Sequence, residues 1–185
     1  MKNNSHFHTA KANKNDEFYT KLEDIENELA HYTDFFKDKV VYCNCDSPDH
    51  SNFWKYFYDN FQPLGLKRLI STYLDNTQSF KTEYDGESMI KTPLIGNGDF
   101  SSDECVEILK ECDVVVTNPP FSLWRQFIHL LILYNKKFLA IGNKTAVIYR
   151  ELFYKVKENK VWFGYTIPKE FITSCLLYTS DAADE

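Results

Sequence analysis

The sequence predicts an α/β fold built on a doubly wound, mainly parallel sheet. Short apolar runs rich in β-branched residues, such as residues 113–117, are typical of buried parallel strands. Segments with apolar residues at helical spacing, such as residues 122–134, alternate with these runs along the chain. Because strands that alternate with helices form right-handed βαβ units, this order predicts one sheet of mainly parallel neighbours.

The expected elements follow one another regularly after a polar start. Thr20 and Glu23 match a helix capping box, and Ser51 can cap the next helix. Asp85-Gly86 indicates a hairpin or excursion before the third strand. The expected strands are residues 39–43, 66–73, 90–95, 113–117, 137–142 and 161–165. The expected helices begin near Thr20, Ser51 and Ser102 and cover residues 122–134 and 145–157.

The composition favours a single soluble domain. A chain of 185 residues is long enough for one sizeable core, and 43% of its residues are hydrophobic. No apolar run approaches the roughly 20 residues of a membrane span. Residues 1–15 are polar, which predicts a disordered tail without the apolar segment of a signal peptide. We therefore expect a cytoplasmic protein.

Several kinds of site are disfavoured by the sequence. Cys43 and Cys45 form a C-x-C, but no second pair or His cluster completes a metal site, so no metal is expected. The sequence contains neither a glycine-rich phosphate cradle nor a G-x-G-x-x-G, and its histidines do not assemble a Ser/His/Asp triad. The net charge of -6 argues mildly against a stand-alone nucleic-acid binder.

The most informative segment is Asn118-Pro119-Pro120-Phe121, directly after the fourth expected strand. Two prolines cannot extend a sheet ladder, and each holds the preceding residue in an extended conformation. The result is a rigid peptide at the carboxyl end of a strand, where open α/β sheets bind ligands. The Asn118 side-chain carbonyl and the Pro119 backbone carbonyl offer two acceptors, and Phe121 offers a flat apolar face. This set suits a planar amine.

Other polar residues are expected at the same edge of the sheet, because parallel strands end there together. They are Asn44, Cys45, Asp46, Asp75 and Asp99, with Phe100 beside them. Three carboxylates without a Lys or Arg cluster suit a ligand with hydroxyls, amines and positive charge rather than a triphosphate.

These segments together resemble the S-adenosylmethionine-dependent amino-methyltransferases, above all the EcoRI-type adenine-specific modification enzymes. The resemblance rests on residues 15–20, 40–46, 117–122 and 138–143 and covers roughly residues 15–165. It implies a Rossmann-like methyltransferase fold with S-adenosylmethionine as cofactor. The loop after the first strand, residues 43–48, lacks the glycine that most such enzymes carry there, a departure that the EcoRI-like group shares.

The resemblance also implies a role for individual residues. The Asn-Pro-Pro-Phe motif would be catalytic, Asp75 would bind the ribose hydroxyls of the cofactor, and Asp99-Phe100 would lie beside its adenine. The implied catalytic residues are Asn118, Pro119, Pro120 and Phe121. The implied cofactor-binding residues are Tyr19, Thr20, Asn44, Asp46, Asp75, Asp99 and Phe100. Arg125, just after the motif, is interpreted as a solvated helix residue or, less favourably, as a phosphate contact.

The implied reaction is site-specific methylation of the exocyclic amine of a flipped adenine in double-stranded DNA, as in restriction-modification. A cognate restriction endonuclease would share the recognition site, in the cytoplasm of a bacterium or a phage-infected cell. The reaction requires only a planar amine as the methyl acceptor, so an RNA base or a protein glutamine is an alternative substrate. A catalytically silent cofactor- or DNA-binding remnant is a second alternative.

The resemblance implies a domain organisation as well. Residues 16–174 would form a catalytic domain that is incomplete at its C-terminus, with a target-recognition region expected beyond the catalytic motif. Residues 175–185 resemble the translation of a transposon-end adapter used in sequencing libraries, so we interpret them as a non-native tail and leave them out of the fold.

Overall fold

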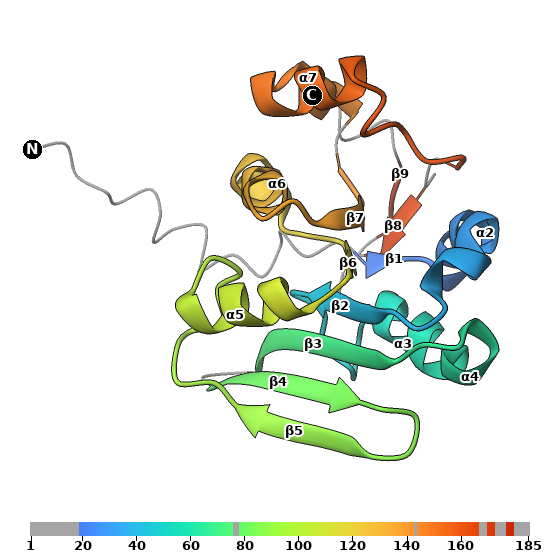
Figure 1. Cartoon of the computed structure of the whole chain (residues 1–185), viewed down its shortest axis with the longest axis vertical. Helices are drawn as coiled ribbons and strands as arrows, with labels where there is room; N and C mark the ends of the chain where they lie inside the picture. The colour runs from blue at the N-terminus through green and yellow to red at the C-terminus, as the bar shows by residue number, and fades with distance from the viewer. Residues whose placement is uncertain (1–18, 76–77, 143, 167–169, 173–176, 180–185) are drawn as a thin grey trace, which may run out of the picture.

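The structure, a computed structural model, describes residues 19–75, 78–142, 144–166, 170–172 and 177–179 (Figure 1). The tail expected to be disordered, residues 1–15, lies outside these residues. No helix in the described part of the chain is both long and apolar enough to cross a membrane.

Two sheets are present in the described residues. The strands of the larger sheet are β2 (Val40–Asn44), β3 (Arg68–Asp75), β4 (Gln78–Tyr84), β5 (Met89–Pro93), β6 (Val114–Thr117) and β7 (Lys137–Ala140). The smaller sheet contains β1 (Tyr19–Thr20), β8 (Glu170–Ile172) and β9 (Leu177–Thr179), of which β9 lies within residues 175–185, the segment interpreted from the sequence as a non-native tail. The strand order is β5-β4-β3-β2-β6-β7 in the larger sheet and β1-β8-β9 in the smaller one.

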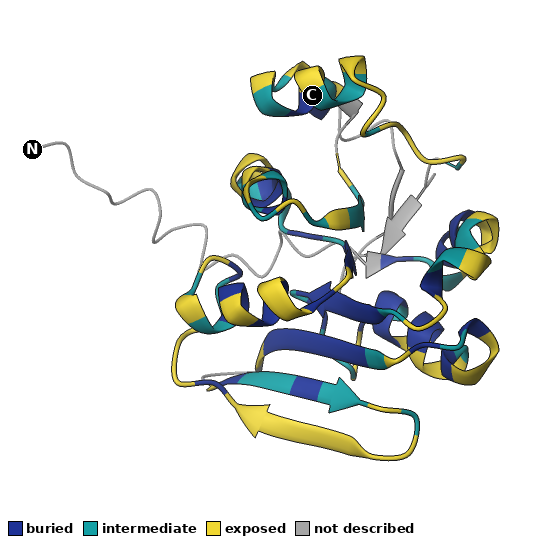
Figure 2. Cartoon of the chain, in the orientation of Figure 1, coloured by how far each residue is buried: buried dark blue, intermediate teal, exposed yellow. Residues whose placement is uncertain are grey.

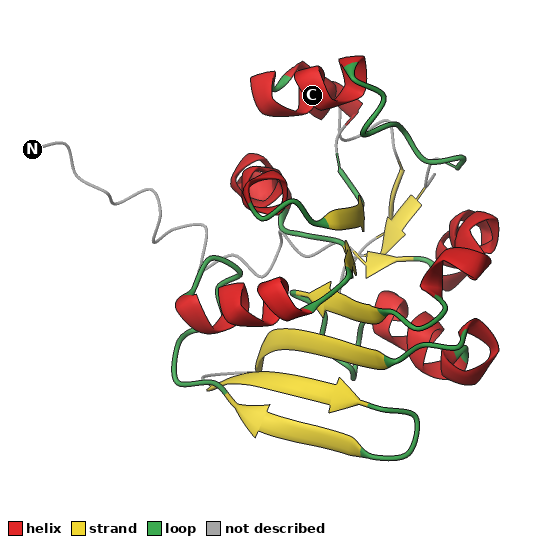
Figure 3. Cartoon of the chain, viewed as in Figure 1, coloured by secondary structure: helices red, strands yellow, loops and turns green. Residues whose placement is uncertain are grey.

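Helices cover both faces of the larger sheet (Figures 1 and 3). The helices before β3 are α2 (Leu22–Leu29), η2 (Ala30–Phe36), α3 (Asn52–Asp59) and α4 (Phe61–Leu64). The later ones are α5 (Asp103–Glu111), η3 (Phe121–Leu123), α6 (Trp124–Leu133), η4 (Lys144–Ile148) and α7 (Arg150–Lys157). The first group packs on one face of the sheet, and α5, α6 and α7 pack on the other.

The central strands are buried because both of their faces are covered. Alternate side chains of a strand point to opposite faces, so Val41 and Cys43 pack toward α2 and α3, whereas Val40 and Tyr42 pack toward α5 and α6. All residues of β2 and β6 are buried, while every residue of β5 at the sheet edge is exposed (Figure 2). The doubly wound α/β fold predicted from the sequence is thereby confirmed.

The third predicted strand, residues 90–95, forms at β5, which is the second strand of a hairpin around Asp85-Gly86. β3 pairs antiparallel with β4, and β4 pairs antiparallel with β5. The turn is closed at Asp85, whose side chain accepts hydrogen bonds from the backbone of Glu87 and Ser88, and Gly86 has φ +98°. Because both pairs are antiparallel, β5 runs in the same direction as β3. The chain therefore leaves β5 at the carboxyl edge of the parallel strands, as expected. The sheet is mixed, with parallel pairs β3-β2, β2-β6 and β6-β7.

Two local predictions were wrong. Residues 161–165 form no strand, because the backbone N–H of Tyr165 donates to the Glu28 side chain instead of to a sheet. The capping box at Thr20 is also absent, since α2 begins after Lys21 without a side-chain cap and Thr20 belongs to β1. By contrast, Ser51 caps α3 as predicted and accepts hydrogen bonds from the backbone of Phe53 and Trp54.

Candidate active site

The candidate site lies where the direction of winding changes. From β2 the chain crosses by α3 to β3, on one face of the sheet, whereas from β6 it crosses by α6 to β7, on the other face. The carboxyl ends of the neighbouring strands β2 and β6 therefore flank a topological switch point, which is the usual ligand position in open α/β sheets. The Asn118-Pro119-Pro120-Phe121 segment follows β6 at this point (Figure 3).

The motif ends the strand as its prolines require. Pro120 is extended, with φ −55° and ψ 125°, and its carbonyl accepts a hydrogen bond from the backbone N–H of Leu123 as the chain turns into α6. Pro119 is buried, and Asn118 and Phe121 are partly buried. The segment is thus a fixed turn, with its amide side chain and its ring at the carboxyl edge of the sheet.

The helix after the motif is anchored to the end of β7. The indole N–H of Trp124 donates to the carbonyl of Ile141 at 2.7 Å, and the backbone N–H of Ile141 donates to the carbonyl of Thr117 at 3.2 Å. Gly142 lies against the indole, where a Cβ atom would come within 2.2 Å of the ring. These contacts fix both ends of the motif segment relative to the sheet.

Thr117 joins the ends of β6 and β2. Its hydroxyl donates to Asp46 Oδ2 at 2.6 Å and lies against the backbone carbonyl of Asn44. The other carboxylate oxygen of Asp46 accepts from the Ser51 hydroxyl at 2.6 Å. Cys45, with φ +67°, supplies the left-handed residue that turns the loop back toward β6. The loop after β2, which contains no glycine, is therefore held in place by side-chain hydrogen bonds.

Asn44 presents a buried donor at this edge. The residue is 1% exposed, and its Oδ1 accepts a weak hydrogen bond from the Cys45 thiol at 3.1 Å. Its Nδ2 has no hydrogen-bond partner among the described residues. A buried donor left unsatisfied costs about 1–3 kcal/mol, so this amide is suited to a ligand that brings an acceptor.

Thr20 lies close to the same group. Asn52, the first residue of α3, donates from Nδ2 to the Thr20 carbonyl at 2.8 Å. The Thr20 hydroxyl is buried and has no hydrogen-bond partner among the described residues. The sequence-predicted residues Thr20, Asn44, Asp46 and Asn118 are thus brought together around the N-terminus of α3 and the end of β6, with Tyr19 adjacent in β1.

The remaining predicted cofactor residues are Asp75, Asp99 and Phe100, which lie outside this hydrogen-bonded group. Asp75 ends β3, three residues beyond the Asn44–Thr72 pair. Asp99 is held in its own loop, where its Oδ1 accepts from the backbone and the hydroxyl of Ser101. Phe100 is buried edge-on against Phe127 of α6, with ring centroids 5.3 Å apart. No hydrogen bond between described residues joins Asp99 to Thr117 or Asp46.

The residue that sequence reasoning missed is Thr117. Its position as the last residue of a buried strand, directly before the motif, is the signal that could have identified it, since a buried hydroxyl at a strand end needs a partner. Cys43 contributes no reactive thiolate nearby, because burial, together with the charge of Asp46, raises its pKa well above 9.0. Among the described residues no cluster of His, Cys, Asp and Glu could hold a metal ion.

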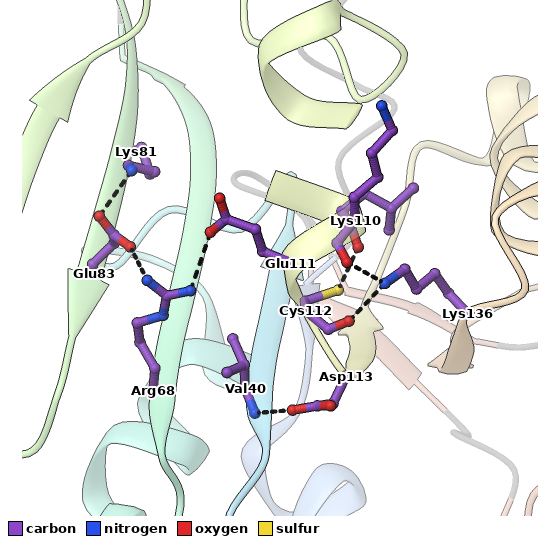
Figure 4. A network of polar contacts seen from close by, with 10 residues as sticks. Val40, Arg68, Lys81, Glu83, Lys110, Glu111, Cys112, Asp113 and Lys136 are labelled. Atoms are coloured by element: carbon purple, nitrogen blue, oxygen red, sulfur yellow. Dashed lines mark hydrogen bonds and ion pairs between the residues drawn. The ribbon is translucent and has the colours of Figure 1, made fainter. Parts of the chain in front are cut away.

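A second polar network lies at the opposite edge of the sheet (Figure 4). Arg68 pairs with Glu83 and Glu111, each at 3.2 Å, at the amino ends of β2 and β3. The ammonium of Lys136 donates to the carbonyls of Lys110 and Cys112 at 2.7 and 2.8 Å. These groups satisfy one another and join α5 to the sheet, which indicates a structural role.

Comparison with known proteins agrees with this geometry. The family model described as the adenine-specific methyltransferase EcoRI matches residues 6–92 and 81–178. The chain belongs to this family. Its fold is accordingly the Rossmann-like methyltransferase fold that the sequence predicted.

Three curated relatives from bacteria show the extent of the similarity to the family. Type II methyltransferase M.MgeORF184P of Mycoplasma genitalium is 50% identical over 165 residues, which are 89% of this chain and 52% of the relative. Type II methyltransferase M.EcoRI of Escherichia coli is 48% identical and covers 87% of this chain and 55% of the relative. Type II methyltransferase M.MpnI of Mycoplasma pneumoniae is 45% identical, with 88% and 51% covered. The chain spans about half the length of these relatives, and no solved structure matches it significantly.

Proposed function

We propose that the whole protein is a site-specific DNA methyltransferase that transfers a methyl group from S-adenosylmethionine to the N6 amine of adenine. The observation that carries this proposal is the fixed Asn118–Phe121 turn at the switch point, beside the loop that ends β2. Membership of the adenine-specific EcoRI family supports adenine as the base that carries the amine.

The motif would act by hydrogen bonding to the amine. The exocyclic nitrogen of adenine is a poor nucleophile because its lone pair is delocalised into the ring. Asn118 Oδ1 and the Pro119 carbonyl would accept its two hydrogens, which favours a pyramidal nitrogen and stabilises the positive charge that develops on it. Because the turn is fixed by Trp124 and Thr117, these acceptors need little reorganisation. The surplus proton can then leave to water.

The flat face of the motif would hold the base itself. An adenine that is stacked inside a DNA duplex cannot reach the motif at the carboxyl end of β6, so it must be flipped out of the duplex before reaction. The partly exposed ring of Phe121 would stack against the flipped base and present its amine edge to Asn118.

The cofactor would lie along the ends of β1, β2 and β3. S-adenosylmethionine, when bound, supplies a methyl group on a sulfonium centre. Asn44 would donate from its buried Nδ2, Thr20 would offer its buried hydroxyl, and Asp75 would accept from ribose hydroxyls. We assign Tyr19, Asp46, Asp99 and Phe100 to the border of the same site. The negative charge of the carboxylates assigned to this site, Asp46, Asp75 and Asp99, would suit the positive charge of the sulfonium.

Double-stranded DNA is the substrate that this assignment requires. The three relatives bear the name type II methyltransferase, and from this we propose a restriction-modification role, with a cognate endonuclease as partner and a bacterial or phage-infected cytoplasm as location.

The substrate class is tested with the full-length protein and labelled S-adenosylmethionine. Duplex DNA, RNA and a glutamine-containing protein are offered in parallel, and the modified product is digested and identified. We expect label in DNA as N6-methyladenine. Label only in RNA or protein, or cofactor binding without any transfer, would contradict the proposed function.

A further inference from the structure

A buried carboxylate on α2 lies apart from the residues assigned above. Glu28 is 7% exposed, and each of its oxygens accepts two hydrogen bonds. Oε1 accepts from the Tyr32 hydroxyl at 2.8 Å and from the Tyr165 backbone N–H at 3.0 Å. Oε2 accepts from the backbone N–H and the hydroxyl of Thr166 at 2.6 and 2.7 Å. None of these partners is a cation, so within the described part of the chain the negative charge of Glu28 is stabilised by hydrogen bonds.

Residues 164–166, which Glu28 binds, approach its carboxylate closely. A Cβ atom on Gly164 would come within 2.4 Å of Glu28 Oε1, so only glycine lets the backbone approach so closely. The Tyr165 ring stacks on His31 with centroids 4.3 Å apart. Tyr165 is nevertheless 70% exposed, and Trp162 and Phe163 are also exposed. Because residues 162–165 bury little apolar surface, we attribute most of their attachment to α2 to the carboxylate.

The protonation states suit this arrangement. Burial alone would raise the pKa of Glu28, but the hydrogen bonds from Thr166, Tyr32 and Tyr165 outweigh it and lower the pKa below 4.5. Burial, together with the bond to Glu28, raises the pKa of Tyr32 to about 12. Near neutral pH the carboxylate is therefore ionised and the phenol remains a donor.

The bound segment leads directly to the strand that pairs with β1. β8 begins four residues after Thr166, and these four residues span at most about 14 Å. β8 pairs antiparallel with β1, with Tyr19 opposite Ile172 and Thr20 opposite Phe171. Among the described strands, β8 is the only ladder partner of β1. Two contacts therefore hold Tyr19–Thr20 at the carboxyl edge: the Asn52 side chain, which donates to the Thr20 carbonyl, and β8, whose position follows from where the segment after α7 is attached.

We propose that Glu28 is a positioning residue for cofactor binding: its carboxylate clasps residues 164–166 against α2 and so keeps β8 paired with β1, which holds Tyr19–Thr20 in place. This role rests on the proposed function, because it takes the ends of β1 and β2 as the cofactor site. Glu28 itself touches neither Thr20 nor the motif through any bond between described residues.

The test uses the 185-residue chain and the variants Glu28→Gln and Gly164→Ala, with Glu26→Gln as control. Glu26 is exposed on the same helix. Gln keeps the size of Glu but puts an NH₂ group where an oxygen accepts two donors, and we expect the amides of Tyr165 and Thr166 to exchange hydrogen about tenfold faster. The dissociation constant for S-adenosylmethionine should rise by a similar factor, also about tenfold.

Two further results separate positioning from a general loss of structure. In the full-length enzyme, Glu28→Gln should raise KM for S-adenosylmethionine while kcat at saturating cofactor changes less than about twofold. The Glu28→Gln and Gly164→Ala effects should not add, because both break the same contact.

The outcomes also separate this inference from the function on which it rests. An unchanged rate of amide hydrogen exchange at Thr166 in Glu28→Gln would contradict the proposal that Glu28 holds residues 164–166 against α2. Faster exchange with unchanged cofactor affinity would overturn the positioning role. If neither the unaltered chain nor the full-length protein binds S-adenosylmethionine, the proposed function is contradicted. The amide exchange data would still show whether Glu28 holds residues 164–166 against α2.

Discussion

Replacing Thr117 by Val tests the junction between the two central strand ends. The side chain is fully buried, and valine has nearly the same shape, so the change removes the hydroxyl without opening a cavity. The lost bond to Asp46 is 2.6 Å long, in the range of an O–H···O⁻ bond, and such bonds contribute about 1.5–3 kcal/mol. For a domain of this size, we expect the melting temperature to fall by about 5–10 °C.

Urea unfolding of the wild-type chain and Thr117→Val measures this loss. The matched control is Thr82→Val, which removes a buried hydroxyl whose bond to the Tyr73 hydroxyl is longer, at 3.4 Å, and neutral. The control should cost about 1 kcal/mol or less. Thr117→Val should also weaken S-adenosylmethionine binding, because it frees the loop at Asp46 that directly follows Asn44 at the end of β2. The reasoning is refuted if Thr117→Val costs no more than Thr82→Val and leaves cofactor affinity unchanged.

Three other changes have defined outcomes. Ser51→Ala removes the cap of α3 and should lower the free energy of unfolding by about 1–2 kcal/mol, measured in urea; an unchanged midpoint would show that the cap is dispensable. Gly142→Ala forces a Cβ atom into the Trp124 ring and should cost about 1–3 kcal/mol and shift the emission of that buried tryptophan; an unaltered spectrum would contradict the packing. The lowered pKa of Glu28 adds stability that is complete above about pH 4.5 and is lost as the pH falls through the folded-state pKa. In Glu28→Gln the free energy of unfolding should therefore fall less steeply below about pH 4.5 than in wild type. The same pH dependence in both proteins would contradict the lowered pKa of Glu28.

Much of the fold could be predicted because its signals are local. Residues 113–117 are apolar and β-branched, and the prolines at 119 and 120 cannot continue a ladder, so strand and turn follow from the sequence. Ser51 was identified as a cap for the same reason, since its hydroxyl meets backbone N–H groups only two and three residues away.

The wrong predictions concern contacts between distant parts of the chain. Residues 161–165 have the pattern of a strand, but the backbone of Tyr165 is bound by Glu28, 137 positions earlier in the chain. Thr20 has the spacing of a capping box, but its strand β1 pairs with β8 near the other end of the chain.

The candidate site shows the same division. Asn118–Phe121 could be located from one segment, because its chemistry lies in consecutive residues. The role of Thr117 depends on a contact with Asp46, 71 positions earlier, and no periodicity in the sequence reports that distance. Whether Asp75, Asp99 and Phe100 contact the cofactor stays a prediction, which substitution of each can test by cofactor affinity.

The proposed role of Asn118 is tested most directly by single-turnover methylation with the full-length protein. Asn118→Ala is compared with wild type and with Asn27→Ala, a change at an exposed position on α2. We expect S-adenosylmethionine affinity to stay within about threefold in all three proteins, while methyl transfer to adenine falls about a hundredfold or more in Asn118→Ala alone. Transfer by Asn118→Ala at the wild-type rate would contradict the assignment of the Asn-Pro-Pro-Phe turn as the catalytic site.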